Sequence, residues 1–385
     1  MENSVIVSAV RTPIGRFGGA LSGFKARELG ALVINECAER VGLDKSFIDE
    51  VIAGNIMQTD PKGNPAREAL LEAGIPIEVP AFTVNMNCGS SLKTVHLADL
   101  MIKTGEAEIV MTMGMEVMSG APFLLRKARF GYRMGDGVCS DFLTDSLEGM
   151  GLTAERLADS YNISREEQDL FAYESQMKAV SAQENGYFKD SIVPVAIKGR
   201  KAFVLREDEG IKPETTLDSL RKLRTVFKKD GTVTAGNSST INDCAAAILV
   251  MGENKAKSLG FNPLAKIISF ASAGVNPDIM GIGPVPATIY SLKKAGLEIK
   301  DIDLFELNEA FASQSISVIR ELNLDRSKVN IDGGAISLGH PVGATGAVIL
   351  TKLISQLKRE NKRYGLATMC IGGGQGVSMI IENIG

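Results

Sequence analysis

The sequence predicts an α/β protein with buried sheets. Short apolar runs alternate along the chain with longer segments of helical periodicity, and 40 glycines and 13 prolines separate them. Strands that alternate with helices of this length are typical of sheets covered by helices. The chain also resembles itself, because one order of strand, polar strand end and helix occurs near both of its ends.

Each element is expected from its own apolar pattern. The expected strands are short apolar runs at Val5–Val10, Glu50–Ala53, Ile109–Met113, Ile192–Ile197, Ala265–Ser272, Leu304–Leu307 and Leu366–Cys370. The expected helices lie between them, at Ala26–Val41, Ser90–Thr104, Glu166–Asn185, Thr240–Ser258, Ala287–Ala295, Phe311–Leu322 and Gly346–Glu360. Ser164 and Glu167 have the spacing of a capping box at the start of the longest helix.

The internal repeat places reactive residues at equivalent turns. Cys88 lies 33 residues after Asn55, and His340 lies 32 residues after Asn308. Small residues that open a helix follow both, so two facing halves would bring the turns together at one cleft. The segment from 118 to 245 has no counterpart in the repeat and is expected to be an inserted lid or binding region. We therefore divide the chain into an N-terminal half (1–117 and 246–262), this insertion, and a C-terminal half (263–385).

Composition excludes several classes of protein. The chain of 385 residues has 42 basic and 46 acidic residues and no basic block, so nucleic acid is not an expected partner. No apolar run approaches the roughly 18 residues of a membrane span, and no signal peptide precedes the first strand, which predicts a cytoplasmic globular protein. Five widely spaced cysteines predict no disulfide framework, and together with two histidines they offer no zinc spacing, so no metal is expected.

Cys88 is a candidate nucleophile. It stands in the segment Asn85-Met-Asn-Cys-Gly-Ser-Ser91, directly ahead of a predicted helix. The free N–H groups and the positive dipole end of a helix stabilise a thiolate, which predicts a lowered thiol pKa. The N–H of Cys88 itself is also available to a developing oxyanion. The alternative is a buried structural cysteine in a strand–helix turn.

Three further residues are candidates for acid–base chemistry. His340 lies among glycines in a loop and is suited to take the proton of a thiol. Cys370 ends a strand and opens the turn Ile371-Gly-Gly-Gly374, whose N–H groups suit an oxyanion. The amide of Asn308 could orient the histidine or a water, or else cap the following helix. His96 is expected to be an ordinary packed residue of its helix.

Two other patterns carry weaker predictions. The glycines at 372–374 lack the helix and acidic partner of a dinucleotide fingerprint. A basic cluster could meet phosphates, although such a run more often forms a solvated face: Lys222, Arg224, Lys228 and Lys229.

The motifs around these residues resemble those of the thiolase family, most closely its bacterial acetyl-CoA acetyltransferase branch. The resemblance covers nearly the whole chain and includes Ser8–Gly15, the Cys88 turn, Gly151–Glu155, Gly231–Asn237, Asn308–Phe311, Gly339–Pro341 and Cys370–Gly374. It implies the thiolase fold: two duplicated βαβαβαββ halves in five layers, α-β-α-β-α, with a loop domain inserted in the first half.

The resemblance also implies a role for each candidate. Cys88 would take up the acyl group after activation by His340, and Cys370 would be the second acid or base. One oxyanion hole would consist of His340 and a water held by Asn308. The other would consist of the N–H groups of Cys88 and Gly372.

The substrates implied are coenzyme A and its acyl thioesters, with no permanently bound cofactor. The residues expected to bind the CoA arm or the thioester are Leu147, Met150, Phe227, Ala235, Ser239, Met280, Ala310 and Phe311, with Lys212 as a phosphate contact. The segment Ala121–Gly137 resembles a tetramerisation loop, which implies a homotetramer built as a dimer of dimers.

The chain departs from the family pattern at three places. Only Glu148 and Gly149 separate Leu147 from Met150, and Gly149 stands where a histidine is usual, so we expect a more open acyl pocket. Ser91 replaces a glycine and is expected to crowd its helix start. Thr345 and Val348 replace serine and arginine, which we interpret as packing away from the chemistry.

The predicted function is the reversible Claisen condensation of two acetyl-CoA molecules to acetoacetyl-CoA and CoA, with ping-pong kinetics through an acyl-cysteine. One alternative is a broader-chain 3-ketoacyl-CoA thiolase of fatty-acid β-oxidation, which the short loop favours. Another is a catalytically silent CoA-binding scaffold, against which the complete set of Cys88, His340, Cys370 and Asn308 argues.

Overall fold

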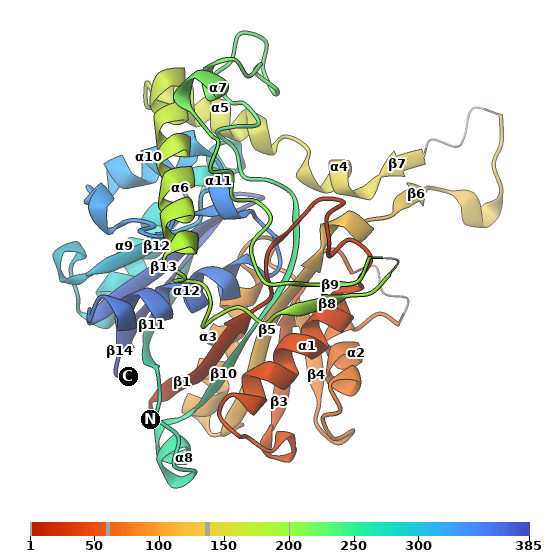
Figure 1. The fold of residues 1–385 in the computed structure, drawn as a ribbon, viewed down its shortest axis with the longest axis vertical. Helices are drawn as coiled ribbons and strands as arrows, with labels where there is room; N and C mark the ends of the chain where they lie inside the picture. Colours follow the sequence, from red (N-terminus) through yellow and green to blue (C-terminus); the bar gives the residue numbers. More distant parts are fainter. Residues whose placement is uncertain (1, 59–61, 135–138, 200) are drawn as a thin grey trace.

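The computed structural model describes residues 2–58, 62–134, 139–199 and 201–385. Its centre is a ten-stranded mixed sheet in the order β12-β13-β14-β11-β1-β10-β5-β3-β4, with β2 paired to β10 (Figure 1). The strands are β1 (Ser4–Arg11), β2 (Gly15–Arg16), β3 (Glu50–Gly54), β4 (Ala81–Val84), β5 (Ile109–Val117), β10 (Asn242–Gly252), β11 (Ala265–Gly274), β12 (Leu304–Leu307), β13 (Tyr364–Ile371) and β14 (Gln375–Asn383).

The sheet consists of two halves with the same topology. In one half, β3 runs parallel to β5, and β5 runs antiparallel to β10. In the other half, β12 runs parallel to β13, and β13 runs antiparallel to β14. The halves join through β1 and β11, which pair at only two positions, Val5 with Lys266 and Ile6 with Ala265. The internal repeat predicted from the sequence is therefore confirmed.

Helices cover both halves and separate them at the centre. The helices involved are α1 (Ala26–Glu39), α2 (Pro65–Glu72), α3 (Ser90–Thr104), α8 (Glu253–Ser258), α9 (Pro284–Ala295), α10 (Ala312–Glu321) and α12 (Thr345–Arg359). Helices α1 and α2 cover one face of the first half-sheet, and α3 packs on its other face. Helix α3 also packs against α12, which in turn packs on β12 and β13 of the second half-sheet. Helix α9 covers β11 and β14. This is the five-layer order that the resemblance implied.

The helix expected over Thr240–Ser258 is wrong for most of its length. The segment forms the strand β10 and then the short helix α8. Alternate side chains of β10 enter two different cores: Ala247 and Leu249 face α1, whereas Ile248 and Val250 face the central helices. A strand buried on both faces has a continuous apolar sequence, and such a run does not distinguish a strand from a buried helix.

The other elements that were expected from the sequence are present and differ from the expectation only at their ends. The expected segments at Ser90–Thr104 and Leu304–Leu307 are found unchanged, whereas β4 and β14 were not expected. Ser164 does cap α6 (Arg165–Glu184) by accepting a hydrogen bond from the N–H of Glu167 at 3.2 Å. The carboxylate of Glu167, however, accepts from Arg320 rather than completing the capping box.

Between β5 and β10 the chain leaves the sheet. This region holds β6 (Phe123–Leu125), β7 (Cys139–Asp141), α4 (Phe142–Leu147), α5 (Met150–Ser160), α6, β8 (Val195–Ile197), β9 (Phe203–Leu205) and α7 (Leu217–Arg221). Helices α5 and α6 pack against α10 of the second half, and α6 packs against α11 (Ala335–Leu338). The predicted division of the chain at 117, 245 and 262 stays a prediction, and β10 runs across its boundary at 245.

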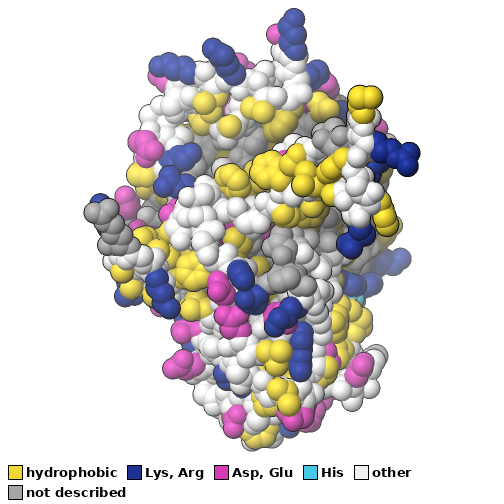
Figure 2. Space-filling view, turned by 90° about the vertical axis from the view of Figure 1, so that its right-hand side faces the viewer, with side chains coloured by type: hydrophobic (Ala, Val, Ile, Leu, Met, Phe, Trp, Pro, Cys, Tyr) yellow, Lys and Arg dark blue, Asp and Glu magenta, His cyan; other side chains and the backbone are white. Residues whose placement is uncertain are grey.

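Strands β6 and β7 form a hairpin that projects from the body (Figure 1). Several of its apolar side chains are exposed, among them Phe123 at 70% and Phe130 at 93%. Figure 2 views the molecule from the side toward which the hairpin projects and shows apolar side chains gathered on its upper part. Residues 135–137 of the predicted tetramerisation loop lie outside the described residues. In the described part of the chain, no helix is long and apolar enough to cross a bilayer.

Two glycines allow the second half of the chain to pack closely on the first. Gly54, the last residue of β3, pairs with Gly114 within β5. A Cβ at Gly54 would lie 2.9 Å from the carbonyl oxygen of Gly343, and one at Gly114 would lie 2.6 Å from the same oxygen. Only residues without a side chain therefore let the turn before α12 approach the sheet this closely.

We expect Gly114→Ala to destabilise the protein by about 1–3 kcal/mol, because the added methyl group meets backbone atoms that have nowhere to move. Thermal denaturation measures the effect. Gly23→Ala is the matched control, since a Cβ at Gly23 meets nothing within 4 Å. Equal melting temperatures for the two variants would contradict the proposed need for close packing at Gly114.

Candidate active site

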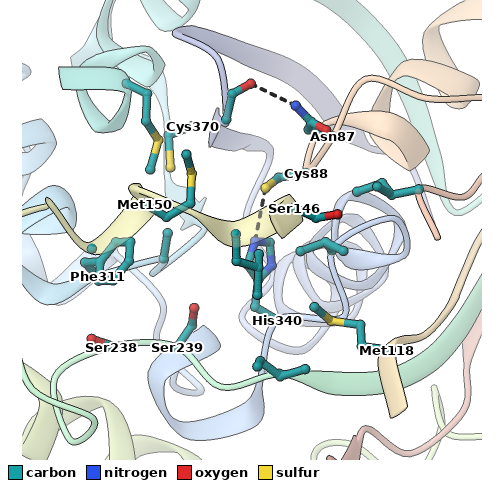
Figure 3. Close-up of a pocket in the computed structure, with 18 of the residues that line it drawn as sticks. Asn87, Cys88, Met118, Ser146, Met150, Ser238, Ser239, Phe311, His340 and Cys370 are labelled. Carbon is teal, nitrogen blue, oxygen red and sulfur yellow. Dashed lines mark hydrogen bonds between the residues drawn. The ribbon is translucent and has the colours of Figure 1, made fainter. Parts of the chain in front are cut away.

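A pocket of about 540 Å³ lies where the two halves meet the inserted region (Figure 3). Eleven of the residues predicted from the sequence line it: Cys88, Leu147, Met150, Phe227, Ser239, Met280, Ala310, Phe311, His340, Cys370 and Gly372. The structure therefore brings together the turns that the internal repeat placed at one cleft.

The first turns of α3 and α12 interlock beneath this pocket. The hydroxyl of Ser91 accepts a hydrogen bond from the N–H of Ala347 at 2.9 Å. A Cβ at Gly346 would lie 2.4 Å from the nitrogen of Leu92. The expectation that Ser91 crowds its helix is wrong, because this fully buried side chain links the two halves instead. Both helices thus begin at the pocket, with Cys88 just ahead of α3.

His340 is held between two partners. Its Nε2 lies 3.3 Å from the Sγ of Cys88, and its Nδ1 lies 2.7 Å from the hydroxyl of Thr345. Burial lowers the pKa of His340 to about 4, so the imidazole is neutral at physiological pH. With the Nδ1 proton donated to Thr345, Nε2 presents its lone pair to the thiol. The expectation that Thr345 lies away from the chemistry is therefore wrong, whereas Val348 does pack in the core.

Burial also controls Cys88, and it reverses the shift that the sequence predicted. Desolvation raises the pKa of the Cys88 thiol to about 11. The N–H groups of Gly372 and of Cys88 itself lower that pKa, but by less, and the charge of Glu116 raises it further. The expectation of a lowered pKa is wrong, and the resting pair is a neutral thiol beside a neutral imidazole.

Cys370 also lines the pocket, where it belongs to an apolar cluster with Met280 and Phe311. Burial raises the pKa of its thiol, and the neighbouring Cys88 raises it further. The side-chain amide of Asn87 donates to the carbonyl of Gly372 at 2.9 Å and so ties the Cys88 turn to the turn after Cys370. Both thiols are therefore protonated at rest within one largely apolar space.

Asn308 is buried just beyond β12 and outside the lining of this pocket. Neither its amide nitrogen nor its amide oxygen has a hydrogen-bond partner among the described residues. It does not cap the next helix, whose N-cap is Phe311 without a side-chain bond, so the capping alternative is wrong. A buried amide with both atoms free is expensive unless it serves a ligand or water.

The other residues that the sequence analysis considered lie apart from the pocket. Lys212 and Ala235 are exposed and do not line it. His96 stacks on Phe270 with ring centroids 4.1 Å apart, as expected for a packed helix residue. The four residues of the basic cluster are exposed, and Lys228 pairs with Asp159 at 2.7 Å.

Sequence reasoning missed several residues that position the site. Asn242 accepts a hydrogen bond from the backbone N–H of His340 at 3.0 Å, and Glu116 accepts one from Gly343 at 3.0 Å. Glu116 could have been found from the sequence, because it is the single carboxylate in the otherwise mostly apolar strand β5. The described residues contain no group of three or more His, Cys, Asp or Glu side chains placed to hold a metal ion.

A thiol in contact with a neutral imidazole, at the start of two helices and inside an apolar pocket, defines a site for nucleophilic cysteine chemistry. Residues 4–254 match the family model described as "Thiolase, N-terminal domain", and residues 261–383 match "Thiolase, C-terminal domain". The chain therefore belongs to the thiolase family.

Similar proteins cover the chain almost completely. A probable acetyl-CoA acyltransferase of Staphylococcus epidermidis is 52% identical over 99% of both chains, and an acetyl-CoA acetyltransferase of Pseudomonas aeruginosa is 49% identical over the same share. Among solved structures, the acetyl-CoA acetyltransferase of Bacillus anthracis has a TM-score of 0.98 at 44% identity, covering 100% of this chain and 99% of that one. Human mitochondrial 3-ketoacyl-CoA thiolase in complex with CoA has a TM-score of 0.97 at 43% identity, covering 100% and 98%.

The depressed pKa of His340 predicts a pH-dependent stability. The unfolded chain protonates this histidine near pH 6.5, whereas the folded protein does so only near pH 4. Its contribution to stability is thus lost as the pH falls from about 6.5 to 4. We expect His340→Asn to remove about 2–3 kcal/mol of the stability difference between pH 7.5 and pH 4.5. Denaturant unfolding at the two pH values measures this, and an undiminished difference in the variant would contradict a neutral His340.

Proposed function

We propose that this protein catalyses the reversible Claisen condensation of two acetyl-CoA molecules to acetoacetyl-CoA and CoA. The observation that carries the proposal is the 3.3 Å contact of Cys88 with His340 in a pocket that also holds Cys370. The relatives named for acetyl-CoA acetyltransferase activity support it, since they match this chain over its full length.

The first half-reaction transfers an acetyl group to Cys88. As Sγ attacks the thioester carbon, Nε2 of His340 takes its proton, and the N–H groups of Cys88 and Gly372 stabilise the oxyanion. The carbon–sulfur bond to CoA then breaks, and Cys370 protonates the departing thiolate. Acetyl-Cys88, an imidazolium and the thiolate of Cys370 remain.

The second half-reaction returns every proton. The thiolate of Cys370 is strongly basic because its thiol is buried, and it removes the α-proton of a second acetyl-CoA. The imidazolium of His340 and a water held by Asn308 stabilise the enolate, whose carbon attacks the acetyl group on Cys88. The bond to Cys88 breaks, and its thiolate recovers the proton from His340.

The CoA arm is assigned to the side of the pocket that holds Met150, Phe227, Ser239 and Met280. CoA is a substrate in this scheme and not a resident cofactor. Contacts of Lys212 and Ala235 with the nucleotide end of CoA stay predictions, as do the cytoplasmic location and a place in lipid metabolism.

A broader-chain 3-ketoacyl-CoA thiolase is the second candidate. The wall beyond Cys88 is apolar and consists of Ile56, Met57, Met118, Phe142, Leu147, Ile241 and Val342. Gly149, in the place of the usual histidine, is exposed and does not line the pocket, so no side chain from this position closes the wall. These observations favour room for an acyl chain longer than acetyl.

CoA-dependent thiolysis of acetoacetyl-CoA and of a medium-chain 3-ketoacyl-CoA, compared by kcat/KM, tests both candidates. We expect a preference for acetoacetyl-CoA and a loss on the order of 10³-fold or more in Cys88→Ala. The exposed Cys139 provides the control Cys139→Ala, which keeps its activity. Equal use of the longer substrate would favour the second candidate, and activity on neither substrate would favour the silent scaffold.

We also propose a homotetramer in which the β6–β7 hairpin joins two dimers. Its exposed Phe123, Leu125 and Phe130 support an interface with another copy of the chain, because a large exposed group of apolar side chains in one segment is uncommon on monomers. We expect light scattering to give a tetramer for the native protein and a dimer for the double variant Phe123→Ser, Phe130→Ser. Phe47→Ser, at an exposed site in the first half, is the control. A native monomer at micromolar concentration would overturn the proposal.

A further inference from the structure

Glu116 is a carboxylate buried in the wall of the site. It is fully buried near the end of β5, where its neighbours in the strand are apolar or glycine. Four donors bind its two oxygens: Oε1 accepts from the side-chain amide of Asn55 at 2.8 Å and from the N–H of Met57 at 3.0 Å, while Oε2 accepts from the N–H of Ile56 at 3.1 Å and of Gly343 at 3.0 Å.

These donors belong to two turns that come from different halves of the chain. Ile56 and Met57 follow β3 in the first half and line the pocket. Gly343 belongs to the second half, three residues after His340, and a Cβ there would lie 2.4 Å from Oε2. A single carboxylate therefore connects one wall of the pocket to the turn that carries His340.

The charge of Glu116 has no opposite charge to offset it, since it forms no salt bridge within the described residues. Burial raises its pKa to about 7, while the three backbone donors lower it and Asp243 of β10 raises it further. On the facing turns, the titratable groups are Cys88 and His340, and the Glu116 charge acts to raise the pKa of Cys88. The group therefore changes charge near neutral pH, beside the reacting pair.

We propose that Glu116 is a positioning residue for acyl transfer, which fixes the His340 turn against the Asn55–Met57 turn and so holds Nε2 on the Cys88 thiol. Because it rests on the proposed function, the proposal needs a readout that does not depend on thiolase turnover. Alkylation of Cys88 by iodoacetamide is such a readout, since the thiolate is the reacting species.

The variant to test is Glu116→Gln, which keeps the size of the side chain but removes the charge and turns an amide NH₂ toward backbone donors. Turnover in acetoacetyl-CoA thiolysis is expected to fall at least tenfold at pH 8, chiefly in kcat. The rate of Cys88 alkylation is expected to rise severalfold at the same pH, because the nearby negative charge no longer opposes the thiolate. All proteins carry Cys139→Ala so that the exposed thiol does not react.

The pH dependence distinguishes this charge effect from a merely looser pocket. Below about pH 6, Glu116 is protonated in the native protein as well, so the ratio of variant to native alkylation rates is expected to approach one. A loosened pocket would give the same ratio at every pH. The fall in kcat should likewise be smaller at pH 6 than at pH 8.

Glu155→Gln is the matched control. Glu155 is equally buried, and its carboxylate accepts from the N–H groups of Thr232 and Val233 rather than from the His340 turn. We expect this control to lose thermal stability without any pH-dependent change in the Cys88 alkylation ratio. A Glu116→Gln protein with unchanged kcat, or with a pH-independent alkylation ratio, would overturn the positioning role. Absent thiolysis in the native protein would instead contradict the proposed function, and the alkylation comparison would still stand.

Discussion

The rest of the structure depends on one constraint, the close approach of two backbone segments from the two halves of the chain. The turn before α12 lies directly on Gly54 and Gly114, which are partners on the neighbouring strands β3 and β5. No side chain intervenes, so the first turns of α3 and α12 come into contact, and Cys88 and His340 meet at 3.3 Å. The reactive pair is thus a product of how two half-sheets and their inner helices pack, and neither half contains it alone.

The same packing explains why the pair is neutral at rest. Closing the two halves over the site removes water from both groups, which raises the pKa of the thiol and lowers that of the imidazole. The Cys88 thiol is therefore protonated before the substrate binds. In the proposed reaction, the attack of sulfur places negative charge on the thioester oxygen, where the N–H groups of Cys88 and Gly372 would stabilise it by preorganised electrostatics.

The sequence predicted the architecture and the central residues, because both leave local signals. The repeated spacing from Asn55 to Cys88 and from Asn308 to His340 indicated two facing halves, and small residues marked the turns at the cleft. Three features had no such signal. The strand β10 looks like a helix because it is buried on both faces. The pKa of Cys88 depends on burial by residues distant in the chain. The bonds of Thr345 to His340 and of Glu116 to Gly343 exist only once the halves close.

The two asparagines that follow β3 and β12 occupy equivalent positions in the two halves but form different hydrogen bonds. Asn55 donates its side-chain amide nitrogen to Glu116 and to the carbonyl of Met115, at 2.8 Å each, so both of its donor hydrogens are used within the protein. Asn308, at the matching position, donates to no protein atom in the described chain. Duplication of the fold therefore has not duplicated its hydrogen bonding: one asparagine donates both amide hydrogens to the protein frame, whereas the amide of its counterpart stays available to a group that the described chain does not supply.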